Sequence, residues 1–586
     1  MNFQNYYILS DMRFVLTALL LFSFLFSKSQ TAAEKWADSV YHSLSKDERI
    51  AQLMVVRLSS LERGGTVTYF DKQVGELVKK YNIGGVLVFQ GGPHKQADMI
   101  NGLNKISKTP IMFSVDGEWG LSQRIYDSVM PLPRQMMLGA MSDSTILYEY
   151  GKIVASQCRR LGIHLNYAPV VDVNNNPGNP VINDRSFGED KFKVASFAIQ
   201  YMKGMQDNGI LACAKHFPGH GDVTVDSHYD LPVINKSMAQ LQETELYPFR
   251  RIFAEGVGSV MIAHLYIPAI DATPNTATSV SKKAVTGLLR NEMGYQGLSF
   301  TDALEMQGVQ KFYPKGKASV ASLFAGNDVL CLPGDVPAAI ADIKAAIRTK
   351  QLSWQQIEER CKKLLRAKYH YVWKHTDPIN KANITEDLNK GVAEMRQKVA
   401  ENAITLLAKK DEAFFPLTTK EKIAYVAAGV NAANTFAKGL QENNNADIYF
   451  IRLSGNNADQ LTRLKNNLLN NYSRVIIGVH NINRAPANNF GIGKETVDFI
   501  NQVSSSQSAF VFLFGNAYAA KNWRNAANLA VAYEDDSIVQ VAALKMLHGS
   551  VPFRGTTPVT ITDEFPYGFG ILTAKEADPR KKKALR

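Results

Sequence analysis

The sequence predicts an α/β protein in which an N-terminal (β/α)8 TIM-like barrel precedes an αβα sandwich domain. Short apolar runs alternate with amphipathic stretches between residues 50 and 375. Several of these runs are continuously apolar, which is typical of strands buried on both faces of a parallel sheet. A second alternation begins near residue 403. At 586 residues the chain is too long for one hydrophobic core, which indicates two or three domains.

The first region contains eight candidate strands. They are residues 53–58, 83–90, 110–116, 163–173, 210–216, 259–265, 298–303 and 327–333. Helical patterns lie between them at residues 71–81, 144–162, 237–256 and 281–294, and a helix over residues 353–374 closes the region. Eight strands, each followed by a helix or a long loop, predict a (β/α)8 barrel of about 250 residues plus insertions.

Six further apolar runs predict an open, doubly wound sandwich. They are residues 403–409, 422–429, 447–453, 475–481, 510–516 and 529–535. This region contains neither GxGxxG nor GxxxxGK[ST], so nucleotide binding is not supported. We expect the barrel to cover residues 31–375, a linker residues 376–395, the sandwich residues 396–573 and a basic tail residues 574–586.

The first thirty residues have the features of a secretory signal peptide. Met12 and Arg13 precede the apolar run FVLTALLLFSFLF, which ends at Phe26 and is followed by small and polar residues. The run is shorter than a bilayer span, and an uncleaved membrane anchor is the alternative. We therefore expect residues 1–30 to be removed and the protein to be exported to the periplasm or cell envelope, without stable membrane insertion after cleavage.

Charge and cysteine content exclude some other classes of protein. The formal net charge is +12, and no stretch interleaves basic and aromatic residues, so no nucleic-acid partner is expected. The four cysteines stand singly in apolar or helical contexts, without CxxC spacing. They are Cys158, Cys213, Cys331 and Cys361. We expect buried free thiols rather than disulfides or a metal framework.

Polar residues close six of the eight candidate strands of the barrel. They are Gln90, Asp116, Asp172, the pair Lys215 and His216, His264 and Asp302. Active sites of (β/α)8 barrels lie at the carboxyl ends of the strands and take residues from several of them. The sequence therefore predicts an active site at this end of the barrel.

Several residues in this region also have a structural interpretation. Asp302 suits a helix N-cap as well as a nucleophile at the barrel mouth. Asp116 and Arg124 can bind sugar hydroxyls, or they can pair with each other to brace a turn. Arg185 lies in an irregular loop rich in proline and asparagine. Lys215 ends a strand, where a buried cation is costly unless it meets a partner or a ligand.

The segment KHFPGHGDVTVDSHYDLP, residues 215–232, concentrates histidine and aspartate. Its H-x3-H spacing suits a zinc site only on a helix, and Pro218 with the glycines beside it excludes a helix here. The other interpretation is an acid–base pair. Asp226 can orient the ring of His228 and stabilise its protonated form, which leaves the second ring nitrogen to exchange a proton. His220 is left as a structural histidine.

Together with SVDGEWGLSQRI, NDRSFG and SFTDALEMQG, this segment resembles glycoside hydrolase family 3, and most closely its β-N-acetylglucosaminidases. The resemblance covers nearly the whole mature chain. It implies a retaining mechanism without cofactor or metal, in which Asp302 is the nucleophile and His228, polarised by Asp226, is the acid/base. It also implies a set of residues that hold the sugar, namely Asp116, Arg124, Arg185, Lys215 and His216.

The resemblance further implies an exported β-N-acetylhexosaminidase that removes terminal β-linked N-acetylglucosamine from peptidoglycan fragments (muropeptides) or chito-oligosaccharides. The subgroup usually reads DQEGGR where this chain has DGEWGL, so Trp119 and Leu121 alter the rim of the pocket. Ala303 stands where an acidic residue is common. Alternatives within the family are a β-N-acetylglucosaminide phosphorylase and a β-glucosidase. Alternatives of another class are a zinc hydrolase and a non-catalytic wall-binding protein.

Overall fold

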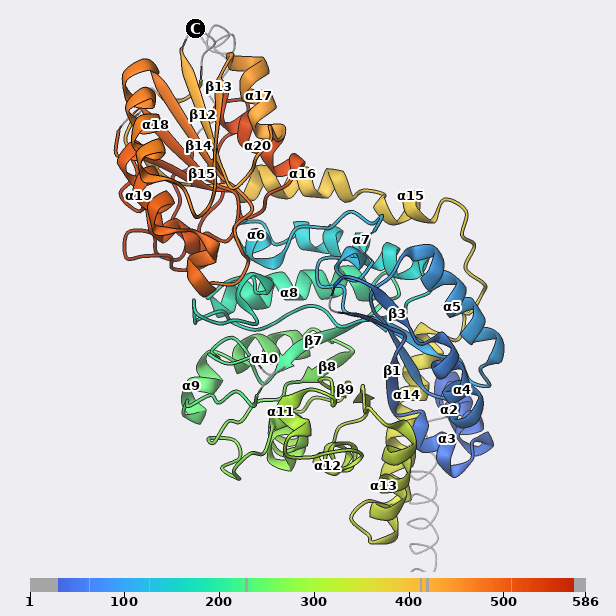
Figure 1. Ribbon diagram of the computed structural model, residues 1–586. Coiled ribbons are helices and arrows are strands. Elements are labelled where there is room, and N and C mark those ends of the chain that lie inside the picture. The colour runs from blue at the N-terminus through green and yellow to red at the C-terminus, as the bar shows by residue number, and fades with distance from the viewer. Residues whose placement is uncertain are drawn as a thin grey trace, which may run out of the picture.

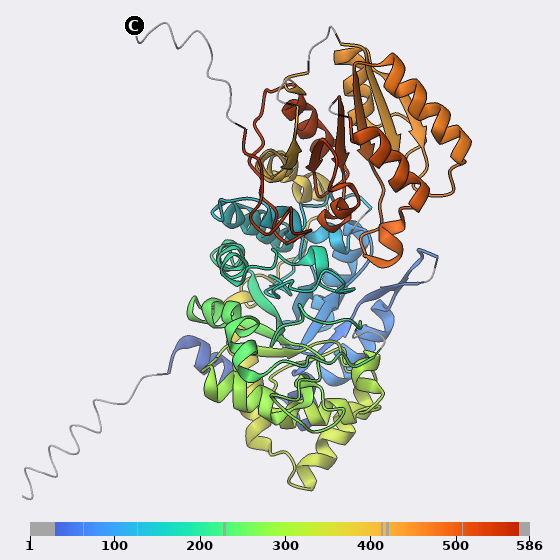
Figure 2. The same ribbon diagram turned by 90° about the vertical axis from the view of Figure 1, so that its left-hand side faces the viewer.

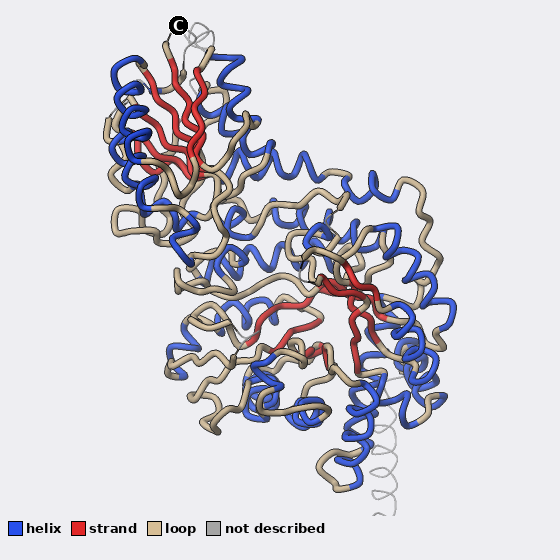
Figure 3. The backbone as a smooth tube through the Cα atoms, viewed as in Figure 1, coloured by secondary structure: helices blue, strands red, loops and turns tan. Residues whose placement is uncertain are grey.

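The computed structural model describes residues 30–62, 64–125, 127–226, 230–411, 414–417, 421–506 and 508–573. It contains two large sheets, one in the barrel and one in a second body beside it (Figure 1, Figure 3). The predicted signal peptide, apart from its last residue, and the predicted basic tail lie outside the described residues. The limits given above for the barrel, the linker and the sandwich domain stay predictions.

The first sheet is a barrel of eight parallel strands. They are β1 (Met54–Arg57), β4 (Gly85–Val88), β5 (Met112–Val115), β6 (Leu165–Asn166), β7 (Leu211–Phe217), β8 (Ser259–Ile262), β9 (Leu298–Thr301) and β10 (Leu330–Cys331). Their order is β10-β1-β4-β5-β6-β7-β8-β9, and a bridge between Phe300 and Val329 links β9 back to the segment of β10. Each strand coincides with one of the eight apolar runs, and the predicted fold class is confirmed.

Helices cover the outside of the barrel. They are α2 (Ala32–Ser43), α3 (Lys46–Ala51), α4 (Asp71–Tyr81), α5 (Pro93–Ile106), α6 (Gln135–Gly139), α7 (Ile146–Arg160), α8 (Lys191–Gln206), α9 (Met238–Glu243), α10 (Leu246–Ala254), the π-helix η4 (Lys283–Glu292), α11 (Gln307–Gln310), α12 (Lys317–Ala325), α13 (Val336–Arg348) and α14 (Trp354–Tyr371). The helix predicted over residues 237–256 is interrupted, because Pro248 lacks an N–H and is accommodated in the first turn of a new helix, α10. In the described part of the chain, no helix is both long and apolar enough to cross a membrane.

One element that the periodicity does not predict is an antiparallel hairpin after β1. It consists of β2 (Ser59–Leu61) and β3 (Val67–Tyr69) and projects from the barrel (Figure 2). Each strand has only three residues, too few for a recognisable alternation. The turn contains Gly64 and Gly65 with φ of 105° and 88°, a backbone region that glycine adopts readily and other residues avoid.

Alternate residues along the strands fill the barrel interior. Leu211 and Cys213 of β7 and Leu298 and Phe300 of β9 belong to one buried cluster, together with residues of the other six strands. Because side chains alternate between faces with a period of two, the next inward residue of each strand lies one layer nearer its carboxyl end. For β7 and β9 that next residue is charged, namely Lys215 and Asp302. Cys213 and the other three cysteines are buried free thiols, as predicted.

The second sheet has six strands between two layers of helices. The strands are β11 (Thr405–Lys409), β12 (Ile423–Ala428), β13 (Asp447–Ile451), β14 (Arg474–Val479), β15 (Ala509–Leu513) and β16 (Asn528–Val531), in the order β11-β16-β15-β14-β12-β13. Helices α18 (Ala458–Asn471) and α19 (Lys494–Ser504) cover one face, and α16 (Val392–Ala403), α17 (Thr435–Asn444) and α20 (Ser537–Leu547) the other, with α15 (Ile384–Asn389) leading in from the barrel (Figure 1). Five strands are parallel, as a doubly wound sheet requires, whereas β11 pairs with β16 in antiparallel fashion.

Candidate active site

A pocket of about 380 Å³ lies at the carboxyl ends of the barrel strands. Lys215 continues the inner face of β7 two residues beyond Cys213, and Asp302 continues that of β9 two residues beyond Phe300. Asp116 directly follows β5. All three line the pocket. The alternation of the strands therefore places one lysine and two carboxylates in the layer above the apolar interior.

Two carboxylates hold Lys215 in the floor of the pocket. Its Nζ lies 2.8 Å from Oδ1 of Asp116 and 2.8 Å from Oε1 of Glu118. Burial alone would lower the pKa of Lys215, but the two carboxylates outweigh burial and raise this pKa. Burial alone would raise the pKa of each carboxyl group, yet the neighbouring cations hold the pKa of Asp116 below, and that of Glu118 well below, its usual value. All three groups are therefore charged at neutral pH.

Glu118 also fixes Arg185 through a bidentate ion pair. Nε of Arg185 donates to Oε2 at 3.0 Å, and Nη2 donates to Oε1 at 2.8 Å. Nη1 of the same guanidinium donates to the carbonyl oxygen of Val181 at 3.1 Å. Glu118 is only 1% exposed, so a single buried carboxylate pairs with a lysine of β7 and with an arginine of the loop after β6.

The guanidinium of Arg185 also sets the tautomer of His216. Nη2 lies 3.3 Å from Nε2 of His216, and because a guanidinium can only donate, Nε2 accepts. The ring proton is then on Nδ1, which lies 2.8 Å from Oδ2 of Asp172 and donates to it. The backbone N–H of His216 donates to Oδ1 of Asp172 at 3.2 Å. Burial would raise the pKa of Asp172, but its contacts with His216 and His220 lower this pKa.

Arg124 enters the pocket from the loop after β5. Its Nη2 donates to Oδ2 of Asp116 at 3.0 Å. Its guanidinium lies 4.7 Å from the centroid of the Phe89 ring, a cation–π distance. The two residues therefore pair with each other, as the structural interpretation expects, and both also line the pocket, whereas sugar binding by them stays a prediction.

Backbone contacts hold Asp302 at the mouth of the barrel. Its N–H donates to the carbonyl oxygen of Ile262 on the neighbouring strand at 2.9 Å. Its Oδ1 accepts the N–H of Ala303 at 2.8 Å. The Asp302 carboxylate is half-buried in the pocket wall. It is therefore anchored on the barrel rather than carried on a long loop.

Most of the predicted site residues meet in this one pocket. Six of them line it, namely Asp116, Arg124, Arg185, Lys215, His216 and Asp302. Asp226 lies on the loop after β7, is half-buried and does not itself line the pocket. His228 lies outside the described residues, so its role stays a prediction. Among the described residues, which leave out His228, no group of three His, Cys, Asp or Glu side chains is placed to hold a metal ion.

Three residues of the site have no catalytic or binding role in the sequence-based prediction. Glu118 and His220 line the pocket, and Asp172 supports it from behind His216. The spacing of Glu118, two residues after Asp116, is the signal that could have indicated it. Asp172 is recognised as a polar strand end, but its partner lies on the next strand, and a single sequence does not reveal that pairing.

The glycines of the loop after β7 allow close packing. A Cβ at Gly221 would lie 1.7 Å from the carbonyl oxygen of Val173. Gly219 has a φ of 129°, and a Cβ there would lie 2.7 Å from the Cβ of Glu245. Neither position has room for a side chain. The first part of the loop is thus fitted closely against two neighbouring segments.

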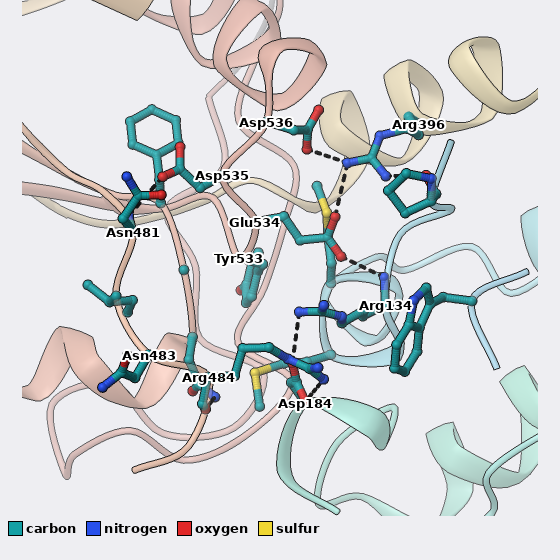
Figure 4. A pocket seen from close by; sticks show the side chains of 18 of the residues that line it. Arg134, Asp184, Arg396, Asn481, Asn483, Arg484, Tyr533, Glu534, Asp535 and Asp536 are labelled. Carbon is teal, nitrogen blue, oxygen red and sulfur yellow. Dashed lines mark hydrogen bonds and ion pairs between the residues drawn. The ribbon is translucent and has the colours of Figure 1, made fainter. Parts of the chain in front are cut away.

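A second pocket, of about 280 Å³, lies where the second sheet meets the barrel (Figure 4). Arg484, in the loop after β14, donates two hydrogen bonds of 2.9 Å to the carboxylate of Asp184 in the barrel. The backbone N–H of Arg134 in the barrel donates to Oε1 of Glu534, after β16, at 2.7 Å. The Trp119 ring lies 4.9 Å from the guanidinium of Arg134 and 5.3 Å from that of Arg484. Trp119 follows Glu118 in the sequence and Asp184 precedes Arg185, and both Glu118 and Arg185 line the pocket of about 380 Å³. The second domain therefore contacts the loops that carry that pocket.

Residues 45–367 match the family model described as the glycosyl hydrolase family 3 N terminal domain. The chain is 30% identical over 333 residues to beta-hexosaminidase A of Pseudoalteromonas piscicida, an alignment that covers 52% of this chain and 56% of that protein. The chain thus spans little more than half the length of that relative. It is 31% identical over 291 residues to the beta-hexosaminidase of Chromobacterium violaceum, with 48% of this chain and 80% of that protein covered.

The fold is similar to that of solved structures over most of the chain. A glycoside hydrolase family 3 beta-N-acetylglucosaminidase from Paenibacillus sp. str. FPU-7 aligns with a TM-score of 0.71 at 27% identity, covering 89% of this chain and 99% of that one. A beta-glucoside phosphorylase aligns with a TM-score of 0.77 at 21% identity, covering 91% of this chain and 97% of that one. At that identity the second likeness concerns the fold alone.

Proposed function

The chain belongs to glycosyl hydrolase family 3, and we propose that it is an exported, retaining β-N-acetylhexosaminidase. It removes terminal β-linked N-acetylglucosamine from peptidoglycan fragments or chito-oligosaccharides. The names of its relatives support this activity, since two are beta-hexosaminidases and a structural neighbour is a beta-N-acetylglucosaminidase. The residues of the barrel pocket supply the chemical argument.

The observation that carries the proposal is the polar, charge-balanced pocket around Asp302. The charged residues that line it in the described structure are four cations and four carboxylates, namely Arg57, Arg124, Arg185, Lys215, Asp116, Glu118, Asp302 and Glu305. Because these charges balance, the pocket favours a neutral ligand rich in hydroxyl groups over a phosphate or a nucleic acid. A sugar has this chemistry, and the fixed ion pairs present donors and acceptors to its hydroxyls.

In the proposed mechanism Asp302 attacks the anomeric carbon. A carboxylate oxygen of Asp302 bonds to C1 while the bond from C1 to the leaving oxygen breaks, and that oxygen takes a proton from His228. In the second step the oxygen of a water molecule bonds to C1, its proton passes to His228, and the bond to Asp302 breaks. Two displacements at the same carbon return the β configuration.

The loop after β7 is the basis for assigning the acid/base to His228. The loop follows the end of β7, where Lys215 and His216 line the pocket, and Asp226 and His228 come later in the same loop. A carboxylate bonded to one ring nitrogen keeps a histidine in the form that exchanges a proton at the other nitrogen. We expect His228→Ala to flatten one limb of the pH–rate profile, and an unchanged profile would remove this assignment.

Turnover of 4-nitrophenyl N-acetyl-β-glucosaminide tests the activity, and NMR of the first product tests retention. We expect the β anomer to form first, and Asp302→Ala to lose at least about a thousandfold in kcat/KM. Full activity in Asp302→Ala would remove the nucleophile from the proposal. The assay is run with and without inorganic phosphate, because a sugar 1-phosphate product would assign the chain to the phosphorylases instead.

Export rests on the apolar run that precedes residue 30. The measurement is N-terminal sequencing of the protein recovered from the cell-envelope fraction of its producing cell. A first residue near position 31 is expected. A full-length chain recovered from the cytoplasm would contradict export and leave the catalytic proposal untouched.

A further inference from the structure

His220 is a buried histidine that lines the pocket and whose ring makes no hydrogen bond within the described residues. The residue is 1% exposed, and among the described residues neither Nδ1 nor Nε2 has a hydrogen-bond partner. Buried polar groups are nearly always hydrogen-bonded, and one that is left unsatisfied destabilises the fold. The ring lines the same pocket as Asp302 and Lys215. A ligand in that pocket can supply the missing bonds.

Backbone contacts fix the position of His220. Its N–H donates to Oδ1 of Asp172 at 2.7 Å, and its carbonyl oxygen accepts from Nδ2 of Asn179 at 3.0 Å. The next residue, Gly221, packs against the backbone of Val173 with no room for a side chain. The ring is therefore held in the pocket wall before a ligand binds, which is what a selective contact needs.

The ring of His220 is neutral at physiological pH. Burial, with a contribution from the neighbouring His216, lowers its pKa to about 4. A neutral imidazole has one N–H donor and one acceptor nitrogen. It can donate to the carbonyl oxygen of an acetamido group or accept from the N–H of that group.

We propose that His220 hydrogen-bonds the acetamido group on C2 of the sugar and thereby selects 2-acetamido sugars over 2-hydroxy sugars. The inference rests on the proposed function, because it takes Asp302 as the residue that bonds to C1. Asp302 and His220 line the same pocket, and C2 is the ring carbon next to C1.

His216 is the other histidine in this part of the pocket. The two rings meet edge-on, with centroids 5.7 Å apart. The nitrogens of His216 are already bonded to Asp172 and Arg185, whereas neither nitrogen of His220 has a hydrogen-bond partner among the described residues. Of the two neighbouring rings, His220 is therefore the one that can recognise a substituent.

Substrate selectivity tests this role. We would measure kcat/KM of wild type and His220→Ala on 4-nitrophenyl N-acetyl-β-glucosaminide and on 4-nitrophenyl β-glucoside. The value for the acetamido substrate should fall about 10- to 100-fold and that for the glucoside much less, so that their ratio falls about tenfold or more. His220→Asn keeps a donor and an acceptor and should restore part of the ratio. Because His220 is neutral, both His220 variants should show the same acid and alkaline limbs in the pH–rate profile as wild type.

His164→Ala is the matched control. His164 is also buried, and burial also lowers its pKa to about 4, but it precedes β6 at the opposite end of the barrel, where its Nδ1 accepts from Phe113. This variant should lose thermal stability and keep the wild-type ratio. If both His220 variants lost activity equally on the two substrates, or lost none, the proposed contact would be wrong.

Sugar binding separates failure of this inference from failure of the proposed function. Calorimetric titration with N-acetylglucosamine and with glucose needs no turnover. A wild type that turns over neither glycoside contradicts the proposed activity, yet a preference for N-acetylglucosamine that His220→Ala abolishes still supports the contact. Equal binding of the two sugars by wild type, or a preference that survives His220→Ala, overturns it.

Discussion

Replacing Glu118 by glutamine removes one charge from the floor of the pocket with almost no change in shape. The carboxylate is 1% exposed and accepts from Lys215 at 2.8 Å and from Arg185 at 2.8 and 3.0 Å. In Glu118→Gln the amide oxygen can keep two of these donors, but the amide N–H₂ then faces the third. Two buried cations lose part of their compensation at the same time.

The expected loss of stability follows from the buried ion pairs. Removing one partner of a buried pair costs about 3 to 5 kcal/mol, and we take about 4 kcal/mol for Glu118→Gln. The entropy of unfolding near 60 °C is about 2.1 cal/mol/K per residue, or about 0.7 kcal/mol/K over the roughly 320 residues that match the family domain. The barrel transition should therefore move down by about 6 °C.

The pH dependence of this loss has a definite sign. Burial would raise the pKa of Glu118, but Arg185 and Lys215 hold it well below the usual 4.5. A carboxyl group with a depressed folded pKa contributes its full stabilisation above the unfolded pKa and loses it as the pH falls through the folded pKa. The difference in Tm between wild type and Glu118→Gln should be constant from about pH 8 to pH 5 and should narrow only below about pH 4.5.

Differential scanning calorimetry between pH 3 and pH 8 measures both quantities. Glu305→Gln is the control, because Glu305 lines the same pocket but its pair with Arg57 is about one-third exposed, at 37% and 32%. A pair of that exposure is worth about 0 to 1 kcal/mol, so the control should shift Tm by less than about 2 °C. A Glu118→Gln protein as stable as wild type at pH 7, or a gap that widens in acid, would refute this reasoning.

Three other substitutions test separate parts of the structure. Gly221→Ala places a Cβ about 1.7 Å from the carbonyl oxygen of Val173. This substitution should lower the free energy of unfolding by about 3 kcal/mol or more, measured as a lower Tm. Wild-type stability would contradict the close packing. Asp172→Asn removes the charge that accepts the Nδ1–H of His216 and should lower kcat/KM about 10- to 100-fold, whereas unchanged kinetics would show that this support is dispensable. Arg484→Ala removes a half-exposed cation at the contact between the domains. It should lower the free energy of unfolding by less than about 1 kcal/mol and leave kcat unchanged. A large loss of stability would mean that this contact holds the domains together.

The strand ends of the site could be predicted because two simple regularities coincide there. Inward residues recur with a period of two, and the carboxyl ends of parallel strands meet at one edge. Lys215 and Asp302 are each the next inward residue after an apolar pair, so the apolar runs alone place them at the mouth of the barrel. Asp116 follows its strand in the same way.

Features that depend on contacts between distant segments could not be predicted. Whether Asp172 supports His216, and whether His220 has a partner, depends on which loops meet after folding. The antiparallel direction of β11 likewise leaves no trace in its apolar run. The hairpin after β1 is different, because adjacent glycines at positions 64 and 65 are a recognised turn signal that the periodicity argument passes over.

The central claim is that Asp302 forms a bond to the sugar during turnover. The most direct measurement is peptide mapping by mass spectrometry after the protein is incubated with an activated fluoro-N-acetylglucosaminide whose glycosyl-enzyme breaks down slowly. The account predicts a mass increase of one sugar on the peptide that contains Asp302, and on no other. A sugar bound to a different carboxylate, such as Asp116 or Glu305, would contradict it.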